Sequence, residues 1–549
     1  MMLSFIKGLN KINGLVPARE IRAREVAKGL RRKHKSVDRE TTMMRRTEYK
    51  PRLDENGNPI PKSPRRPKKK VACMIGYCGT GYNGMQIQNN PNIETIEGDL
   101  FKAFVAAGAI SPENADDLKK NGFMRAARTD KGVHAAGNVI SCKLIIEDED
   151  IIEKINAQLP DQIRVWGIER TNKSFDCRKM CSSRVYEYLL PTYSLLPPKP
   201  RSVLAELLRK EKENYPEIMR KDEEGEKWWE ETLQAVFDSG ISPDDLAKAQ
   251  KILESSGSSG SNKAEEEGKE KTKLYDDDGN ITEAGKLIKS IKSVENKRRR
   301  AYNISTERLN IFREALNQYE GAHNFHNFTL GKTFKDPSSV RYMKKLTVSD
   351  PFVIEGTEWV SIKIHGQSFM LHQIRKMIAM AALVIRTGCP LERISDCFGP
   401  IKVNIPKAPA LGLLLENPVY DGYNTTLEKH GYNAIDFSKY QEEMDKFKMK
   451  YIYDKIYAEE VKENTFYGFF GFVDSFKGTS DTKEGRHVFD FLGAKFDSAA
   501  LKKHDKVEEA AEAAEPTEPV EPSQTEPSGS DAVSNTEEKD DDSSTTKDN

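Results

Sequence analysis

Short apolar runs alternate along this chain with segments of helical periodicity. Four runs combine β-branched or aromatic residues and predict buried strands, at 71–77, 138–145, 163–168 and 185–190. Farther along, Val360, Ile362 and Ile364 alternate with polar residues, which predicts a strand with one buried face. Helical patterns occupy 93–107 and 306–318. This mixture predicts an α+β fold.

The longest apolar segment, 369–385, predicts a helix in the protein core. It is interrupted by His372, Arg375 and Lys376, and it falls short of the ~20 apolar residues that cross a bilayer. We therefore expect no membrane partner.

Polar ends and a charged insertion complete the predicted organisation. We expect a basic region at 1–70, a first folded half at 71–180, a second folded half at 181–425 with an insertion at about 197–300, a helical extension at 426–501 and an acidic tail at 502–549. Charged residues make up 31% of the chain, so the basic region and the tail are predicted to be largely disordered. A Ser/Gly run at 255–261 predicts a flexible linker inside the insertion.

The formal net charge of zero hides an uneven distribution of sign. The first seventy residues are basic and end in the cluster 61–70, whereas the tail is rich in Glu, Asp, Ser and Thr. Without the tail the body is basic, which favours a polyanionic partner such as RNA. The basic residues 297–300 that close the insertion fit either an RNA-gripping extension or a solvated insert. For the tail, an aid to solubility is the favoured interpretation.

Targeting signals and cysteines bear on the compartment. The cluster at 62–70 is typical of a nuclear import signal or an RNA-contacting arm, so we expect the nucleus. A mitochondrial location is the weaker alternative, because Glu20 and Glu25 interrupt the basic N-terminus. The seven cysteines form no CxxC pair, which fits buried thiols in a reducing compartment. Cys177 and Cys181 could serve a structural zinc, but packing is the favoured role and we assign no metal ligands.

The stretch 124–135 carries the candidate chemistry. It places Asp130 among Arg125, Arg128 and Lys131, whose charges favour the ionised carboxylate of a nucleophile or base. Asp-Lys-Gly is a turn signal, so Asp130 is expected on a loop held by the strand after it. From these residues alone, an exposed ion pair on a surface turn is the favoured alternative.

Five blocks in a fixed order change that balance. They are Tyr77–Gln88 with 92–100, Arg-Ala-Ala-Arg-Thr-Asp-Lys-Gly-Val-His-Ala at 125–135, Arg-Val-Tyr-Glu-Tyr at 184–188, Gly-Ala-His-Asn-Phe-His-Asn-Phe at 321–328 and Gly-Gln-Ser-Phe-Met-Leu-His-Gln-Ile-Arg at 366–375. Together they resemble the TruA family of tRNA pseudouridine synthases, over most of 71–195 and 300–420. The long insertions and charged ends look most like the eukaryotic branch of that family.

The resemblance implies a fold and a catalytic set. The fold would be two ferredoxin-like halves whose antiparallel sheets join around a central RNA-binding cleft. Asp130 would be the catalytic aspartate, Tyr186 would stack on the target base, and Arg375 would lie against Asp130. A guanidinium in an apolar helix also needs an anion on physical grounds.

The remaining site residues are expected to bind substrate. Arg128 matches a family arginine that aids base flipping, and Leu413 belongs to a strand, 411–415, that resembles the pocket floor. Lys131 and His134 flank the aspartate and are assigned to substrate binding.

The reaction that the resemblance implies turns uridine into its isomer pseudouridine, so no cofactor is required; a structural zinc is left open. The aspartate could attack C1′, add to C6 or remove a ribose proton, and the sequence does not separate these routes. The expected partner is tRNA, with snRNA and mRNA as further RNAs, and we expect a monomer, with a homodimer as the alternative. Two other functions compete, a non-catalytic RNA-binding or RNA-folding protein and a nucleoside hydrolase.

Overall fold

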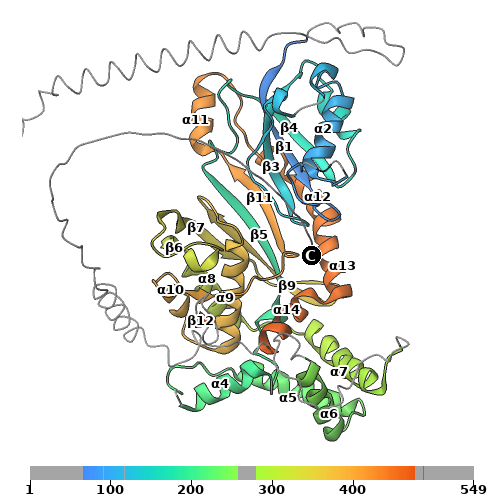
Figure 1. Cartoon of the computed structure of the whole chain (residues 1–549), viewed down its shortest axis with the longest axis vertical. Helices are drawn as coiled ribbons and strands as arrows, with labels where there is room; N and C mark the ends of the chain where they lie inside the picture. Colours follow the sequence, from blue (N-terminus) through green and yellow to red (C-terminus); the bar gives the residue numbers. More distant parts are fainter. Residues whose placement is uncertain are drawn as a thin grey trace, which may run out of the picture. The chain divides into compact units, whose positions relative to one another are not determined.

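A single mixed sheet of ten strands organises the protein (Figure 1). The computed structural model describes residues 66–475, apart from 89, 91, 116–117, 215 and 257–279, together with a short strand at 486–487. The N-terminal region up to residue 65, most of the Ser/Gly linker and the acidic tail lie outside the described residues. The sheet and its helices belong to one compact unit that begins at Lys68.

The predicted strands are present with small changes in their bounds. The sheet consists of β1 (Lys69–Tyr77), β2 (Met124–Arg125), β3 (His134–Leu144), β4 (Ile163–Arg170), β5 (Ser183–Pro191), β6 (Gly321–Asn324), β7 (Val340–Val348), β8 (Phe352–Ile354), β9 (Thr357–Gly366) and β11 (Leu413–Val419). A separate parallel pair is formed by β10 (Val403–Asn404) and β12 (Arg486–His487). The alternation predicted for Val360, Ile362 and Ile364 is confirmed, since all three are buried in β9.

The strand order is β4-β1-β3-β11-β5-β9-β7-β6, with β2 beside β3 and β8 beside β9. Every ladder of this sheet is antiparallel except the one between β3 and β11. In that ladder Leu415 pairs with Ala135, and on its other side Leu415 pairs with Tyr186 of β5. Because adjacent strands lie about 4.8 Å apart, Ala135 and Tyr186 are separated by about 10 Å. Strand β3, which follows the Asp130 loop, and strand β5, which carries Tyr186, therefore lie on either side of β11.

Helices cover the sheet and extend beyond it (Figure 1). They are α2 (Ile96–Ala106), α3 (Ile151–Asn156), α4 (Val203–Asn214), α5 (Glu223–Asp238), α6 (Pro243–Ser256), α7 (Glu283–Arg300), α8 (Thr306–Asn317), α9 (Gln373–Thr387), α10 (Arg393–Asp396), α11 (Asp421–Lys429), α12 (Gln441–Phe447), α13 (Asp454–Glu463) and α14 (Thr465–Ser475). The segment expected to be a core helix is α9, whose residues are buried almost throughout. In the part of the chain that is described, no helix is both long and apolar enough to cross a membrane.

The insertion is folded and uses its own basic residues in packing. Helices α5, α6 and α7 share a small core that includes Val236, Leu246 and Ile288. In the patch 297–300, Arg298 pairs with Glu231, and Arg299 pairs with Glu295 of its own helix. Arg300 donates to the carbonyl of Val461. Two of the four side chains thus join different structural elements and a third pairs within its own helix, which favours the structural interpretation of this patch.

The C-terminal extension is fastened to the sheet by buried charges. After α12 the chain forms a turn of π-helix, Lys448–Tyr453, in which Lys448 Nζ lies 2.9 Å from Glu187 and 2.8 Å from Glu416. The hydroxyl of Tyr453 donates to Glu187 over 2.7 Å. Glu187 and Glu416 belong to β5 and β11, directly after Tyr186 and Leu415, so they face the opposite side of the sheet. The extension therefore supports the two strands from behind.

Replacing Lys448 by Met should destabilise the protein strongly. Glu187 and Glu416 are only 2% and 7% exposed, and without the ammonium both buried carboxylates would lose their nearest cation. The expected loss is about 3–5 kcal/mol in the free energy of unfolding, measured by urea denaturation. Lys446→Met is the control, because this side chain is 72% exposed, and it should change stability by about 0.5 kcal/mol or less. Equal effects of the two variants would contradict the role of the buried charges.

Candidate active site

The loop between β2 and β3 carries Asp130 and is clamped by two buried polar side chains. Asn138 of β3 donates through Nδ2 to the carbonyl of Ala127 over 3.1 Å and accepts through Oδ1 from the Ala127 N–H over 3.3 Å. The hydroxyls of Tyr77 and Thr129 lie 2.8 Å apart, and Asn138 Nδ2 also donates to Tyr77. The residues before Asp130 are thus held rigidly, as the turn signal and the strand after it predicted.

A second segment, 83–88, closes against the other side of this loop. The Met85 N–H donates to the carbonyl of Thr129, and Gly84 has a φ of +94°. A Cβ on Gly84 would lie 3.0 Å from the same carbonyl, so both conformation and space favour glycine here. The segment is tied down by Glu97, which accepts from the Ile87 N–H over 2.9 Å.

Arg125 does not lie beside Asp130, contrary to the sequence prediction. Its Nε is 2.5 Å from Glu97 Oε1, and the Glu97 side chain is completely buried. Burial raises the pKa of Glu97, while the Ile87 N–H and Arg125 oppose that rise. Arg125 belongs to β2, and its side chain meets the first turn of α2 instead of the loop.

A cavity of about 710 Å³ opens between these two segments. Its lining consists of residues 83–88, Asn90 and residues 128–131. Asp130 is the one carboxylate among the lining residues, and Arg128 and Lys131 stand on either side of it. All three side chains are exposed. The candidate catalytic group is therefore accessible to a large ligand.

Tyr186 lies between the two main hydrophobic clusters that pack on the sheet. It packs against both hydrophobic clusters, and its ring is edge-on to Phe369 with centroids 5.0 Å apart. The residue is half-buried. Burial raises the pKa of its hydroxyl; Arg184 opposes this rise, and Cys181 and Asp130 add to it.

Arg375 stands in the first turn of α9 and is held by a backbone contact. Its Nε donates to the carbonyl of Ala408 over 2.6 Å, and the Ala408 N–H donates back to the carbonyl of Arg375. Burial lowers the pKa of the guanidinium, while Tyr188 and Asp130 oppose that change.

The direct ion pair expected between Arg375 and Asp130 is not formed. Among the described residues no carboxylate is in ion-pair contact with Arg375. The side chain is half-buried, so water reaches part of it and an immediate counter-ion is not required. The two terminal nitrogens of Arg375 make no hydrogen bond to the described residues.

His134 and Leu413 occupy supporting positions. His134 is 1% exposed, and its Nδ1 accepts from the Gly79 N–H over 3.1 Å. Burial lowers its pKa to about 4, so the ring is neutral at physiological pH. The structure places this ring behind the loop, away from the accessible surface on which a substrate contact was expected. Leu413 is half-buried at the start of β11 and pairs with Tyr188.

His372 is a residue of this region that sequence analysis did not select. It precedes α9 in a left-handed conformation, with φ 62° and ψ 4°, which is uncommon for a residue other than glycine. Burial, Lys407 and Arg375 lower the pKa of its ring, and Asp130 opposes them. The sequence could have pointed to His372, because it lies three residues before Arg375 in the block 366–375 that carries the family resemblance.

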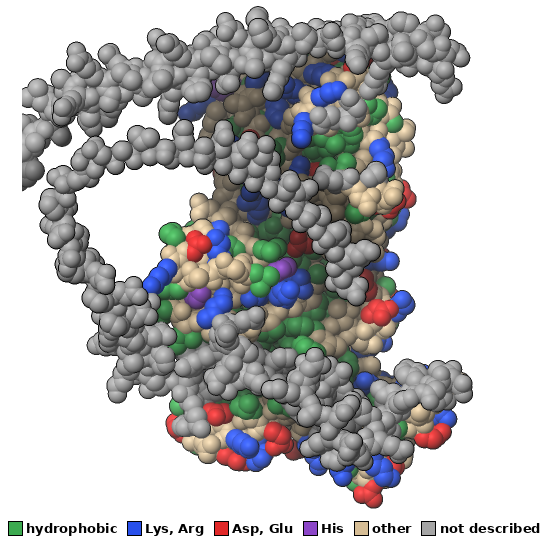
Figure 2. Space-filling model, viewed as in Figure 1, with side chains coloured by type: hydrophobic (Ala, Val, Ile, Leu, Met, Phe, Trp, Pro, Cys, Tyr) green, Lys and Arg blue, Asp and Glu red, His purple; other side chains and the backbone are tan. Residues whose placement is uncertain are grey.

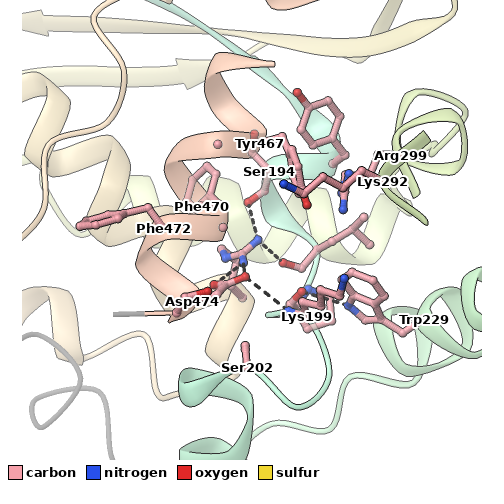
Figure 3. Close-up of a pocket in the computed structure, with 17 residues that line it drawn as sticks. Ser194, Lys199, Ser202, Trp229, Lys292, Arg299, Tyr467, Phe470, Phe472 and Asp474 are labelled. Atoms are coloured by element: carbon pink, nitrogen blue, oxygen red, sulfur yellow. Dashed lines mark hydrogen bonds and ion pairs between the residues drawn. The ribbon is translucent and has the colours of Figure 1, made fainter. Parts of the chain in front are cut away.

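A second cavity, of about 450 Å³, lies between the insertion, α9 and α14 (Figure 3). At its base Arg386 makes two 2.7 Å bonds to Asp474, and the Arg299 guanidinium lies 3.5 Å from the centre of the Tyr467 ring. Lys199 is paired with Glu295 at 2.5 Å. Arg386, Arg299 and Lys199 already have partners within the protein. We therefore interpret this cavity as a packing interface between structural elements.

The cysteine pair proposed as a metal site has other partners. Cys177 Sγ donates to the carbonyl of Met124, and Cys181 Sγ donates to the carbonyl of Ser183. Within the described ranges, no group of three or more His, Cys, Asp or Glu side chains is arranged to hold a metal ion. His323 instead stacks on Phe398, with ring centroids 4.2 Å apart.

Comparison with known proteins identifies the family. A family model described as tRNA pseudouridine synthase matches residues 315–421. The tRNA pseudouridine synthase 1 of Candida albicans is 57% identical over 83% of this chain and 75% of its own length. The protein of the same name from Saccharomyces cerevisiae is 53% identical over 84% of each chain. The tRNA pseudouridine(27/28) synthase of S. cerevisiae is 40% identical over 72% of this chain and 96% of its own.

The family match and these relatives define an RNA-modifying isomerase. The chain belongs to the TruA family of tRNA pseudouridine synthases.

Removing the Asn138 side chain should slow the reaction more than it weakens the fold. Asn138→Ala frees the backbone at Ala127, and a displacement of about 1 Å at Asp130 can lower the rate about 100-fold. The readout is single-turnover formation of pseudouridine in tRNA. The matched control is Asn156→Ala, because Asn156 makes the same pair of backbone bonds to Val165, in β4.

Both variants should lose about 1–3 kcal/mol of stability, measured by urea denaturation. Only Asn138→Ala should lose activity in the folded state. Equal rates for the two folded variants would show that the clamp does not position Asp130.

Proposed function

We propose that this protein isomerises uridines of tRNA to pseudouridine with Asp130 as the catalytic carboxylate. Membership of the family supports the reaction. The observation that carries the assignment of Asp130 is its place as the one carboxylate in the lining of an open cavity, on a loop clamped from both sides. Arg128 and Lys131 line the same cavity beside it.

The chemistry requires the N1–C1′ bond of uridine to break, the uracil to turn, and C5 to bond to C1′. An ionised carboxylate could attack C1′, add to C6 or take a ribose proton, and all three routes use the same accessible oxygen. Because the product is an isomer of the substrate, we propose that the reaction uses no cofactor and no metal ion.

Tyr186 is assigned to stacking on the target base, and Arg375 is assigned to an electrostatic role beside Asp130. Tyr186 would stack on the uracil of a flipped-out nucleotide, an interaction worth about 1–3 kcal/mol. The raised pKa of its hydroxyl makes the phenolate scarce at neutral pH, which favours stacking over removal of the C5 proton. Arg375 has two terminal nitrogens without hydrogen bonds in the described part of the chain, and it would approach Asp130 or the substrate when RNA is bound.

The remaining predicted residues fit the same picture. Arg128, exposed at the cavity, would occupy the place that the flipped base leaves in the stack. Lys131 would contact the RNA backbone next to Asp130. Leu413 would contribute to the floor beside Tyr186, since both pack on one hydrophobic cluster. His134 is proposed here only as a support for the loop.

We also propose that the fold consists of two ferredoxin-like halves. Strands β4, β1 and β3 with α2 and α3 would form one ferredoxin-like half, and β5, β9 and β7 with α8 and α9 the other. The parallel ladder between β3 and β11 supports this division, because it joins two otherwise antiparallel arrangements. The RNA-binding cleft would lie at that junction.

We also propose wider features that rest on sequence alone. The basic cluster at 62–70 supports a nuclear location, with the mitochondrion as the alternative. RNA readers that use shape and backbone charge tolerate several contexts, which supports snRNA and mRNA as further substrates. The long insertion supports a monomer over the homodimer.

The decisive test compares Asp130→Ala with the unaltered protein. We expect the rate of pseudouridine formation to fall by about 1,000-fold or more, because the reacting oxygen is lost, while the Kd for tRNA changes by about threefold or less. Asp161→Ala is the control, since this carboxylate is exposed and paired with Arg164, and it should keep full activity.

An active Asp130→Ala variant would remove the assignment of this residue. A purified wild-type protein that binds tRNA without forming pseudouridine would instead favour the RNA-binding alternative. Release of free uracil would indicate a nucleoside hydrolase.

Two substitutions of Tyr186 separate stacking from proton transfer. Tyr186→Phe keeps the ring and should retain a rate within about fivefold of wild type, whereas Tyr186→Ala should lose about 1–3 kcal/mol, or about 5- to 150-fold. The single-turnover rate at saturating tRNA is the readout. If the Phe variant is as slow as the Ala variant, the hydroxyl takes part in the chemistry and stacking is not the main role.

A further inference from the structure

Basic side chains collect at the start of α9 without acidic partners. We call Lys376, Lys402, Lys407, His372 and Arg375 the α9 basic cluster. Lys376 Nζ donates to the carbonyls of Asn327 and Thr329, each over 3.1 Å, and Lys402 Nζ donates to the carbonyl of His326 over 3.3 Å. Figure 2 shows Lys, Arg and His side chains gathered near the middle of the face in view, in the neighbourhood of α9.

The cluster is positive because its members are not neutralised. Among the described residues no carboxylate pairs with Lys376, Lys402 or Lys407. Lys376 is 3% exposed, and burial followed by the charges of Lys402 and Lys407 lowers its pKa to about 8. A buried ammonium that is surrounded by cations is unfavourable unless an anion joins it.

Two further observations indicate an anionic ligand. His326 is 1% exposed, and neither of its ring nitrogens makes a hydrogen bond of regular geometry. Burial and the charge of Lys402 lower the pKa of the ring to about 4, and nearby backbone groups of Ile401 and Asn324 oppose this fall. The Nδ1 of His372 is also buried without a partner. The N-terminus of α9, a helix of fifteen residues, has no side-chain cap, so its positive end adds to the same field.

The cluster follows a segment that contacts Tyr186. The ring centroid of Phe369, three residues before His372, lies 5.0 Å from that of Tyr186. The charge of Asp130 also opposes the lowering of the pKa of His372 and of Arg375. The contact between Arg375 and Ala408 brings the neighbouring Lys407, which is exposed, to the first turn of α9. An anion bound here would be adjacent to the reacting nucleotide.

We propose that the α9 basic cluster binds a backbone phosphate of the RNA beside the target uridine. This inference rests on the proposed function, since it assumes that the cavity at Asp130 receives a nucleotide. Lys402 and Lys407 supply direct contacts at the surface. Lys376 and the helix end supply a fixed positive field beneath them.

The test measures tRNA affinity against salt for the full-length protein. Lys402→Gln and Lys407→Gln should each reduce the slope of log K for tRNA binding against log salt by about 0.9, and the double variant should reduce it by about 1.8. If affinities converge at about 1 M salt, this slope corresponds to about fivefold weaker binding per lysine at about 0.15 M. The single-turnover rate at saturating tRNA should stay unchanged, because Asn138 and Tyr77 still hold the Asp130 loop.

Lys462→Gln is the matched control, since this lysine is 81% exposed on α13, and Lys407→Arg should restore the lost slope. Inorganic phosphate is a second probe. At equal ionic strength it should compete with tRNA better than chloride does, and the double variant should lose that difference.

Three outcomes would overturn the proposal. They are an unchanged slope in the double variant, loss of phosphate competition without loss of tRNA affinity, and a lower rate at saturating tRNA in place of weaker binding. The second outcome would indicate a site for free phosphate. Failure of the wild-type protein to form pseudouridine would refute the proposed function instead, and the binding slopes would still report on the cluster.

Discussion

The position of β11 between β3 and β5 is the constraint on which the site depends. Its backbone pairs with Ala135 on one side and with Tyr186 on the other, both at Leu415. Side chains alternate along a strand, so a slip of one residue in either ladder would turn Tyr186 to the opposite face. The pairing register therefore decides which face of the sheet carries the Tyr186 ring.

The reverse side of the same strands explains why the chain needs its C-terminal extension. Glu187 and Glu416 directly follow Tyr186 and Leu415, and Lys448 holds both of them in a buried setting. One face of β5 and β11 presents the site, and the other face is braced by α12 and the turn of π-helix. The insertion differs from this extension, because α5, α6 and α7 pack mainly on one another and their basic residues form ion pairs within the insertion.

The proposed roles bring an anionic catalyst, Asp130, together with an anionic substrate. In that proposal RNA phosphates approach the carboxylate, and like charges would oppose their approach. The cations around α9 offset that repulsion from one side, and Arg128 and Lys131 do so from the other. A long-range field of this kind does not require a permanent ion pair, which fits the separation of Arg375 from Asp130.

Local pattern was sufficient for the elements and for the location of Asp130. Strands such as 138–145 and the helix within 369–385 follow from periodicity, because burial of one face is written into the order of residues. The turn that exposes Asp130 follows from Asp-Lys-Gly.

Tertiary structure alone decided which charged side chains lie together. Arg125 lies five residues from Asp130 yet pairs with Glu97, and Lys376, Lys402 and His326 come together from three distant segments. Strand pairing and helix packing determine such meetings, and neither is encoded by spacing along the chain.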